Sequence, residues 1–165
     1  DWSSDVCSSD LRVFGLNMTY HTNTRLSKKQ EKTLGIKFVS FSDLIRTSDV
    51  LTIHIPYKKE THHLINLQTI RKMKKNAFLI NTSRGKIIDE QDLVMALKAK
   101  MIAGAALDVF EKEPIGKSHA MTKMQNVVLA PHIGSSSDET RAKMAQITIQ
   151  NLILGLQGKK MIYSV

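Results

Sequence analysis

Short apolar runs alternate with amphipathic stretches along most of the chain, and this alternation limits the possible folds more than any other feature. Val50–Ile55 is a β-branched run that Pro56 ends, and Ala77–Ile80 is a second apolar run, so both indicate buried strands. Stretches typical of helices lie between such runs, with connections of roughly two to six residues. Strands that alternate with helices in this way form a parallel sheet with helices on both faces. The sequence therefore predicts an α/β fold, a doubly wound, Rossmann-like parallel sheet.

The expected elements follow from apolar periodicity and from capping residues. The expected strands are 17–20, 50–55, 77–80, 102–107 and 127–129. The expected helices are 26–34, 42–46, 67–73, 90–99 and 136–156, and residues 11–14 look like the end of another helix. Gly15 and Gly35 are placed to end helices. Ser42 with Asp43, Asp89, and Ser136 with Glu139 are placed to begin them.

The first ten residues differ from the rest of the chain. They contain Ser-Ser-Asp twice, and they hold the only tryptophan and the only cysteine, Cys7. The string resembles translated sequencing-adapter sequence, so we treat residues 1–10 as a non-native tail and exclude them from fold reasoning. A single cysteine excludes an internal disulfide framework and fits a reducing compartment, so we expect a cytoplasmic protein.

The chain has 165 residues and a formal net charge of +9, which favours anionic partners. Its lysine pairs are scattered, are not interleaved with aromatic residues and accompany no nucleic-acid-binding motif. We interpret them as a solvated surface and expect no nucleic-acid and no membrane partner. No apolar run reaches the length of a membrane span. His62 and His63 are adjacent and lack metal-ligand spacing, so no metal site is expected, and His119 is interpreted as a solvated loop residue.

Three polar residues follow three of the expected strands. Arg84 follows 77–80, Glu113 follows 102–107 and His132 follows 127–129. Ligands of open α/β sheets bind beyond the carboxyl ends of the strands. Arginine binds a carboxylate with a planar fork, histidine can give a proton to a carbonyl oxygen, and a nearby glutamate favours the imidazolium. Each residue alone would be ordinary, but together they form a complete set for redox chemistry on a 2-oxo acid.

The motifs around these residues resemble those of the D-2-hydroxyacid dehydrogenase family. The similar stretches are 81–85 (Asn-Thr-Ser-Arg-Gly), 104–110 (Gly-Ala-Ala-Leu-Asp-Val-Phe), Glu113–Pro114 and 131–134 (Pro-His-Ile-Gly). The stretches 48–50, 54–56, 60–61 and 63–66 match as well, and the resemblance runs from about Leu11 to Gly158. Several ordered motifs at matching spacing are far more specific than a lone glycine motif.

The resemblance implies reversible hydride transfer between NAD(P)H and a small 2-oxo acid, with these side chains in defined roles. Arg84 is similar to the substrate-carboxylate arginine, His132 to the catalytic acid/base and Glu113 to its carboxylate partner. Asp108 is similar to the residue that holds the nicotinamide carboxamide. The other cofactor positions are Thr22, Asn23, Thr24, Arg25, Pro56, Thr82, Ser83 and Gly134, beside Arg84 and His132. Because the stretch 20–25 has no acid and offers His21 and Arg25, the sequence favours NADP slightly over NAD.

The chain departs from the family pattern in one respect: it has no Gly-x-Gly-x-x-Gly turn before Gly15. We therefore expect a piece of a longer enzyme, with a partial nicotinamide dinucleotide-binding domain over 11–135. Residues 136–165 would form a C-terminal helix that packs on the absent substrate domain. Alone, the piece is expected to be inactive and poorly stable, and the intact parent to be a homodimer. The alternative is a non-catalytic, dinucleotide-sensing module like some transcriptional corepressors. The sequence does not identify the 2-hydroxy acid.

Overall fold

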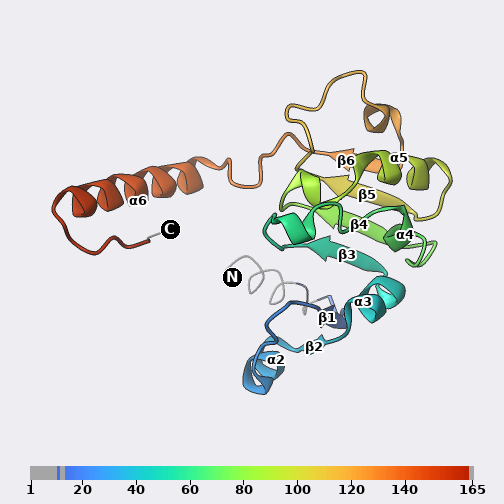
Figure 1. The fold of residues 1–165 in the computed structure, drawn as a ribbon, viewed down its shortest axis with the longest axis horizontal. Coiled ribbons are helices and arrows are strands. Elements are labelled where there is room, and N and C mark those ends of the chain that lie inside the picture. The colour runs from blue at the N-terminus through green and yellow to red at the C-terminus, as the bar shows by residue number, and fades with distance from the viewer. Residues whose placement is uncertain (1–10, 12–13, 164–165) are drawn as a thin grey trace. The chain divides into compact units, whose positions relative to one another are not determined.

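A computed structural model describes residue 11 and residues 14–163 of the chain (Figure 1). The tail over 1–10, with Cys7, lies outside the described residues, as do residues 12–13 of the first expected helix. The chain divides into two compact units, one ending at Pro131 and the other beginning at His132. Each unit is described by itself below.

The first unit contains a four-stranded parallel sheet with the order β3-β4-β5-β6. Its strands are β3 (Val50–Ile53), β4 (Phe78–Asn81), β5 (Gly104–Leu107) and β6 (Val127–Leu129). Their carboxyl ends are in register, because Ile53 lies opposite Asn81, Asn81 opposite Leu107, and Leu107 opposite Leu129. A second parallel pair joins β1 (Met18–Tyr20) to β2 (Ile36–Phe38). The predicted parallel α/β fold is confirmed.

One face of the four-stranded sheet forms the core of this unit. Burial alternates along β3 and β4, so that Leu51, Ile53 and Leu79 face inward. They cluster with apolar residues of α4 (Leu67–Ile70) and α5 (Glu90–Lys98), among them Ile70 and Leu93. Asp89 begins α5 as expected, since its carboxylate accepts a hydrogen bond from the Asp92 N–H.

The opposite face of this sheet is apolar but open in the described part of the chain. Val50, Phe78 and Val128 are 55%, 50% and 69% exposed, and with Ile80 and Ala106 they line a shallow hollow. Parallel sheets are ordinarily covered on both faces. We expected the run 50–55 to be buried throughout and helices to cover both faces. The difference arises because β-branched composition marks a strand without telling which segment covers it.

The remaining elements of the first unit surround these two sheets. Helix α2 (Lys28–Leu34) begins with a capping box from Ser27 to Gln30 and ends, as predicted, at Gly35, whose φ of 66° is left-handed. Helix α3 (Phe41–Thr47) is capped by Ser40, so the prediction that Ser42 and Asp43 cap it is wrong. Asp43 instead supplies the N–H that Ser40 accepts. The unit also contains short 3-10 helices, which are η1 (Lys59–Thr61), η2 (Gly85–Ile87) and η3 (Ala120–Lys123).

The second unit is dominated by α6 (Asp138–Leu156), which ends where the sequence predicts. Its cap is Ser137, which accepts from the Thr140 N–H, and not Ser136 with Glu139. Because three serines stand in a row at 135–137, each can cap the helix, and the predicted cap lies one residue before the observed one. The side chain of Asn151 in α6 donates to the Tyr163 carbonyl and accepts from the Ile162 N–H, and both of these residues lie beyond the end of the helix. Within the described residues, no helix is long and apolar enough to cross a membrane.

Candidate active site

The turn after β4 is shaped by the side chain of Asn81, which is fully buried. Its Nδ2 donates to the Arg84 carbonyl at 3.0 Å, and its Oδ1 accepts from the Ser83 N–H at 3.0 Å. The hydroxyl of Ser83 donates to the carbonyl of Ile55 beyond the end of β3. These bonds satisfy a buried amide and fix the turn 82–84 against the neighbouring strand end. Sequence reasoning treated Asn81 only as part of a motif and missed this role.

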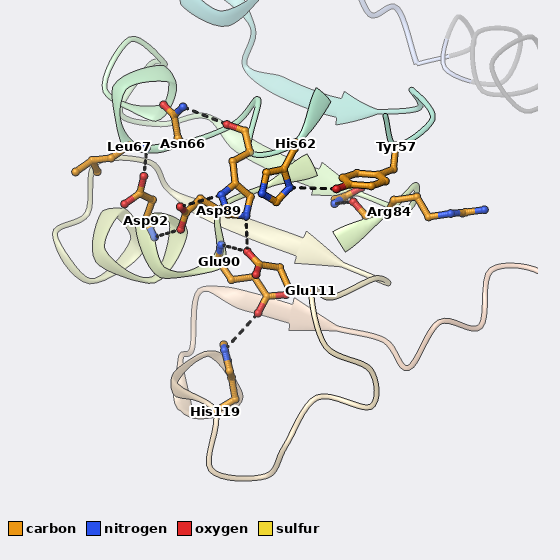
Figure 2. A network of polar contacts seen from close by, with 12 residues as sticks. Tyr57, His62, Asn66, Leu67, Arg84, Asp89, Glu90, Asp92, Glu111 and His119 are labelled. Carbon is orange, nitrogen blue, oxygen red and sulfur yellow. Dashed lines mark hydrogen bonds and ion pairs between the residues drawn. The ribbon is translucent and has the colours of Figure 1, made fainter. Parts of the chain in front are cut away.

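Arg84 projects from this turn with an exposed side chain. One of its terminal nitrogens, Nη1, donates to the Ser83 carbonyl at 2.7 Å. Figure 2 shows the guanidinium pointing away from the network of histidines and carboxylates. A guanidinium has five N–H donors in a planar fork, so this arrangement leaves donors directed outward from the sheet edge. Arg84 is thus placed to bind an anion at the carboxyl end of β4.

Gly85 brings the turn after β4 against the segment after β5. A Cβ on Gly85 would lie 1.9 Å from the carbonyl carbon of Phe110 and 2.5 Å from the nitrogen of Glu111. Only glycine permits this approach. The backbones that carry Arg84 and Glu113 therefore adjoin directly.

The segment after β5 holds two of the predicted site residues. Asp108 is 8% exposed, and its N–H donates to the Asn81 carbonyl at 3.0 Å. Glu113 is exposed, and its Oε1 accepts from the Phe110 N–H at 2.9 Å. This bond folds the Glu113 side chain back over its own loop, where the sequence alone suggested an ordinary turn before proline.

A group of histidines and carboxylates lies around the start of α5, and we call it the Glu90–Glu111 cluster (Figure 2). Its members come from four separate segments: His63, Asp89, Glu90, Glu111 and His119. Sequence reasoning missed it because no spacing in the chain relates these residues. His119, expected to be solvated, instead accepts from the Met121 N–H at 3.3 Å and faces Glu90.

The His63 ring lies between two carboxylates of the cluster, with Nδ1 3.3 Å from Asp89 Oδ2 and Nε2 3.0 Å from Glu111 Oε1. The second contact is close but poorly directed for a hydrogen bond. Burial, and then the nearby Glu111 charge, raise the pKa of Glu90, against a hydrogen bond from the Glu111 N–H that lowers it. Among the described residues, no group of three or more His, Cys, Asp or Glu side chains could hold a metal ion.

The loop after β1 carries the cation predicted for the cofactor. Arg25 donates to both carboxylate oxygens of Glu31, at 2.7 and 2.9 Å, and lies 5.1 Å from the centre of the Phe38 ring. Tyr20 donates to the same carboxylate at 2.8 Å. The hydrogen bond from Arg25 is the largest cause that lowers the pKa of Glu31 to about 2. The structure thus brings an acid to Arg25 that the stretch 20–25 does not contain.

A comparison with known families decides what these features have in common. Residues 7–134 match the model of the D-isomer specific 2-hydroxyacid dehydrogenase, NAD binding domain. The chain belongs to this dehydrogenase family. The match begins inside the tail that we interpreted as non-native, and it ends at Gly134, after the predicted His132.

Relatives and solved structures of the dehydrogenase family extend the match. A glyoxylate reductase of Aeropyrum pernix is 47% identical over 148 residues, which cover 90% of this chain and 44% of the relative. The crystal structure of a glyoxylate reductase from Paecilomyes thermophila has a TM-score of 0.88 at 33% identity, covering 96% of this chain and 47% of that one. An NADPH-dependent glyoxylate/hydroxypyruvate reductase from Sinorhizobium meliloti, solved with NADP and malonate, has a TM-score of 0.88 at 31% identity, with 96% and 48% covered. The chain spans less than half the length of these proteins.

Within the first unit, the dehydrogenase residues predicted from sequence follow the carboxyl ends of neighbouring strands. Pro56 lies beyond β3, Thr82, Ser83 and Arg84 follow β4, and Asp108 with Glu113 follows β5. Thr22, Asn23, Thr24 and Arg25 follow β1. His132 and Gly134 belong to the second unit, where both are exposed. His132 has a φ of 56°, a left-handed value that is uncommon outside glycine. Its pairing with Glu113 stays a prediction.

Proposed function

We propose that this chain is the cofactor-binding part of an NAD(P)-dependent D-2-hydroxyacid dehydrogenase that reduces glyoxylate, hydroxypyruvate or a similar small 2-oxo acid. The observation that carries the proposal is the junction at Gly85, where the Arg84 turn adjoins the Glu113 segment. The names of the relatives supply the substrate class. Since those relatives are more than twice as long, the activity is assigned to the complete enzyme, meaning this chain with the further region that its relatives possess.

The proposed chemistry divides among three side chains. Arg84 binds the substrate carboxylate with its outward-facing donors and so orients the 2-oxo group. His132 gives a proton to the carbonyl oxygen as the carbon is reduced, and takes it back in the reverse reaction. Glu113 lies beside His132 in the complete enzyme and favours its protonated form. The bound cofactor supplies the hydride.

The residues after the strands suit a nicotinamide dinucleotide by their chemistry. Hydroxyl groups of Thr82 and Ser83 and backbone groups near Pro56 and Gly134 lie on loops where dinucleotides bind in such sheets. Asp108 is largely buried at the end of β5, and we assign it to the nicotinamide carboxamide, whose amide hydrogens a carboxylate accepts.

We favour NADP over NAD on the geometry of Arg25. Its bonds to Glu31 use Nε and Nη2, so the guanidinium keeps donors that a 2′-phosphate can use. The pairing with Glu31 and the Phe38 ring also fixes the arginine in place, which lowers the entropy cost of binding phosphate.

The test is a turnover assay of the complete enzyme with glyoxylate, hydroxypyruvate and pyruvate, using NADPH and NADH in parallel. We expect 2-oxo acid reduction with a higher kcat/KM for NADPH. Binding of either cofactor without turnover of any 2-oxo acid would favour the corepressor-like alternative. Equal kcat/KM for the two cofactors would overturn the NADP preference alone. We further propose that the complete enzyme is a cytoplasmic homodimer, which sedimentation and cell fractionation would test.

A further inference from the structure

We propose that Glu90 and Glu111 form a reciprocal clamp that positions the Glu113 loop for catalysis. In this proposal His63 and His119 hold the two carboxylates in place. The inference rests on the proposed function, because it assigns positioning residues to that same site. Neither glutamate touches substrate or cofactor in this account.

The clamp consists of two hydrogen bonds that run in opposite directions. The Glu111 N–H donates to Glu90 Oε1 at 2.5 Å, and the Glu90 N–H donates to Glu111 Oε1 at 3.1 Å. Glu90 is the first residue of α5, so its N–H has no acceptor within the helix. Glu111 therefore caps α5 from a segment 21 residues away in sequence, and charge-assisted bonds of this kind are among the stronger ones.

Two histidines support the clamp from either side. His119 accepts the Met121 N–H at Nδ1, which places its ring proton on Nε2, 3.5 Å from Glu90 Oε2. His63 lies between Asp89 and Glu111 and has a left-handed φ of 50°. Its backbone N–H donates to the Lys86 carbonyl at 3.0 Å, one residue beyond Gly85. The His63 ring thus separates the Asp89 and Glu111 carboxylates.

The clamp is close in the chain to the Glu113 loop and contacts it through the backbone of Phe110. Glu111 lies two residues before Glu113, and the N–H of Phe110, the residue just before Glu111, donates to the Glu113 carboxylate at 2.9 Å. The same Phe110 backbone packs against Gly85, next to Arg84. A shift of residues 110–111 would therefore move both Arg84 and Glu113. Misplacement by about 1 Å is enough to cost about 100-fold in rate.

The experiment compares Glu111→Ala, Glu111→Gln and Glu90→Gln in the complete enzyme. Glu60→Gln, an exposed acid in η1, is the matched control. We expect Glu111→Ala to lower kcat by about 10- to 100-fold with the KM for cofactor nearly unchanged. Glu111→Gln keeps an acceptor for the Glu90 N–H but loses the charge facing His63, so it should retain more activity than Glu111→Ala. The control should match the wild type.

A second measurement follows the clamp without using activity. Amide hydrogen exchange of Glu90 and Glu111 in the wild-type chain should be slow, and in Glu111→Ala the Glu90 amide should exchange at least about 10-fold faster. Similar rates in the two proteins would overturn the clamp. If the two amides are protected in the wild type but Glu111→Ala keeps the wild-type kcat, the clamp is a structural contact only, which also overturns the proposal. Absence of turnover in the wild-type enzyme would refute the proposed function, while the exchange result would still test the clamp.

A variant of His63 separates positioning from simple stability. The groups that face the clamp are His63, His119, Asp89 and Glu113, with the His62 ring stacked on His63 at 3.8 Å between centroids. If the contact of His63 with Glu111 positions the clamp, His63→Gln in the complete enzyme should lower kcat while the KM for cofactor stays nearly unchanged. A wild-type kcat in His63→Gln would remove His63 from the proposal.

Discussion

Gly85 and Phe110 are in direct backbone contact, because a Cβ added to Gly85 would lie 1.9 Å from the Phe110 carbonyl carbon. The contact joins the two segments that carry Arg84 and Glu113. A larger residue at position 85 would require a backbone shift, because the atoms that its Cβ would meet belong to the backbone of Phe110 and Glu111.

Gly85→Ala should destabilise the protein by at least about 1–3 kcal/mol, since the added methyl group cannot fit without a backbone shift. The measurement is urea unfolding of the 165-residue chain followed by circular dichroism. Gly116→Ala is the control, because a Cβ there would meet only Ser118 Oγ at 3.9 Å and should change stability by less than about 0.5 kcal/mol. Equal stability of the two variants would contradict the close approach.

Arg84→Ala should lower kcat/KM for the 2-oxo acid by about 10²- to 10⁴-fold in the complete enzyme. This range corresponds to about 3–6 kcal/mol for two charge-assisted hydrogen bonds to a carboxylate. Arg84→Lys should recover only part of the loss, because an ammonium group cannot form the bidentate pair. Steady-state kinetics with glyoxylate gives the values, and Arg71→Lys at the end of α4 is the control. An unchanged kcat/KM in Arg84→Ala would refute its assignment to the carboxylate.

The strand positions and the strand-end residues could be predicted because each depends on local sequence. Apolar runs gave the positions of β3 through β6, and Gly35 and Asp89 marked helix ends by their own backbone chemistry. Caps chosen among adjacent polar residues were less certain. Ser40 and Ser137, in place of Ser42 and Ser136, show that the first N–H groups of a helix donate to whichever hydroxyl oxygen reaches them.

The Glu90–Glu111 cluster and the role of Asn81 could not be predicted. The cluster depends on contacts between segments far apart in the chain, such as His63 with Glu111. Asn81 makes its hydrogen bonds within its own turn, but its full burial depends on the packing around that turn. A buried asparagine and two ordinary loop histidines carry no periodicity that reports their partners. The pairing of Arg25 with Glu31 is similar, because the acid comes from the following helix and not from the loop itself.

The two faces of the four-stranded sheet should respond differently to the loss of side chains. Leu79→Ala should destabilise the 165-residue chain by about 2–5 kcal/mol, because Leu79 is fully buried. Val128→Ala, at a position 69% exposed on the open face, should cost less than about 1 kcal/mol. With that face open, the wild-type chain alone should melt below about 45 °C, the lower end for mesophilic domains. Thermal melts of the three proteins measure both expectations, and equal losses in the two variants would contradict the assigned faces.

The Arg25–Glu31 pair should appear in an acid titration of the chain. With a pKa near 2 in place of the ordinary 4.5, Glu31 binds its proton less readily in the folded than in the unfolded protein. Its contribution to stability is therefore complete above pH 4.5 and is lost as the pH falls toward about 2. Carboxyl carbon NMR should show the Glu31 midpoint near 2, and Arg25→Ala should move it up toward its ordinary value.

Arg25→Ala in the complete enzyme should also reduce the kcat/KM preference for NADPH over NADH. Lys32→Ala, which removes an exposed cation next to Glu31 in α2, should preserve that preference. A Glu31 midpoint that stays near 2 in Arg25→Ala would show that another group holds the carboxylate, and the cofactor ratio would then have to be explained without this pair.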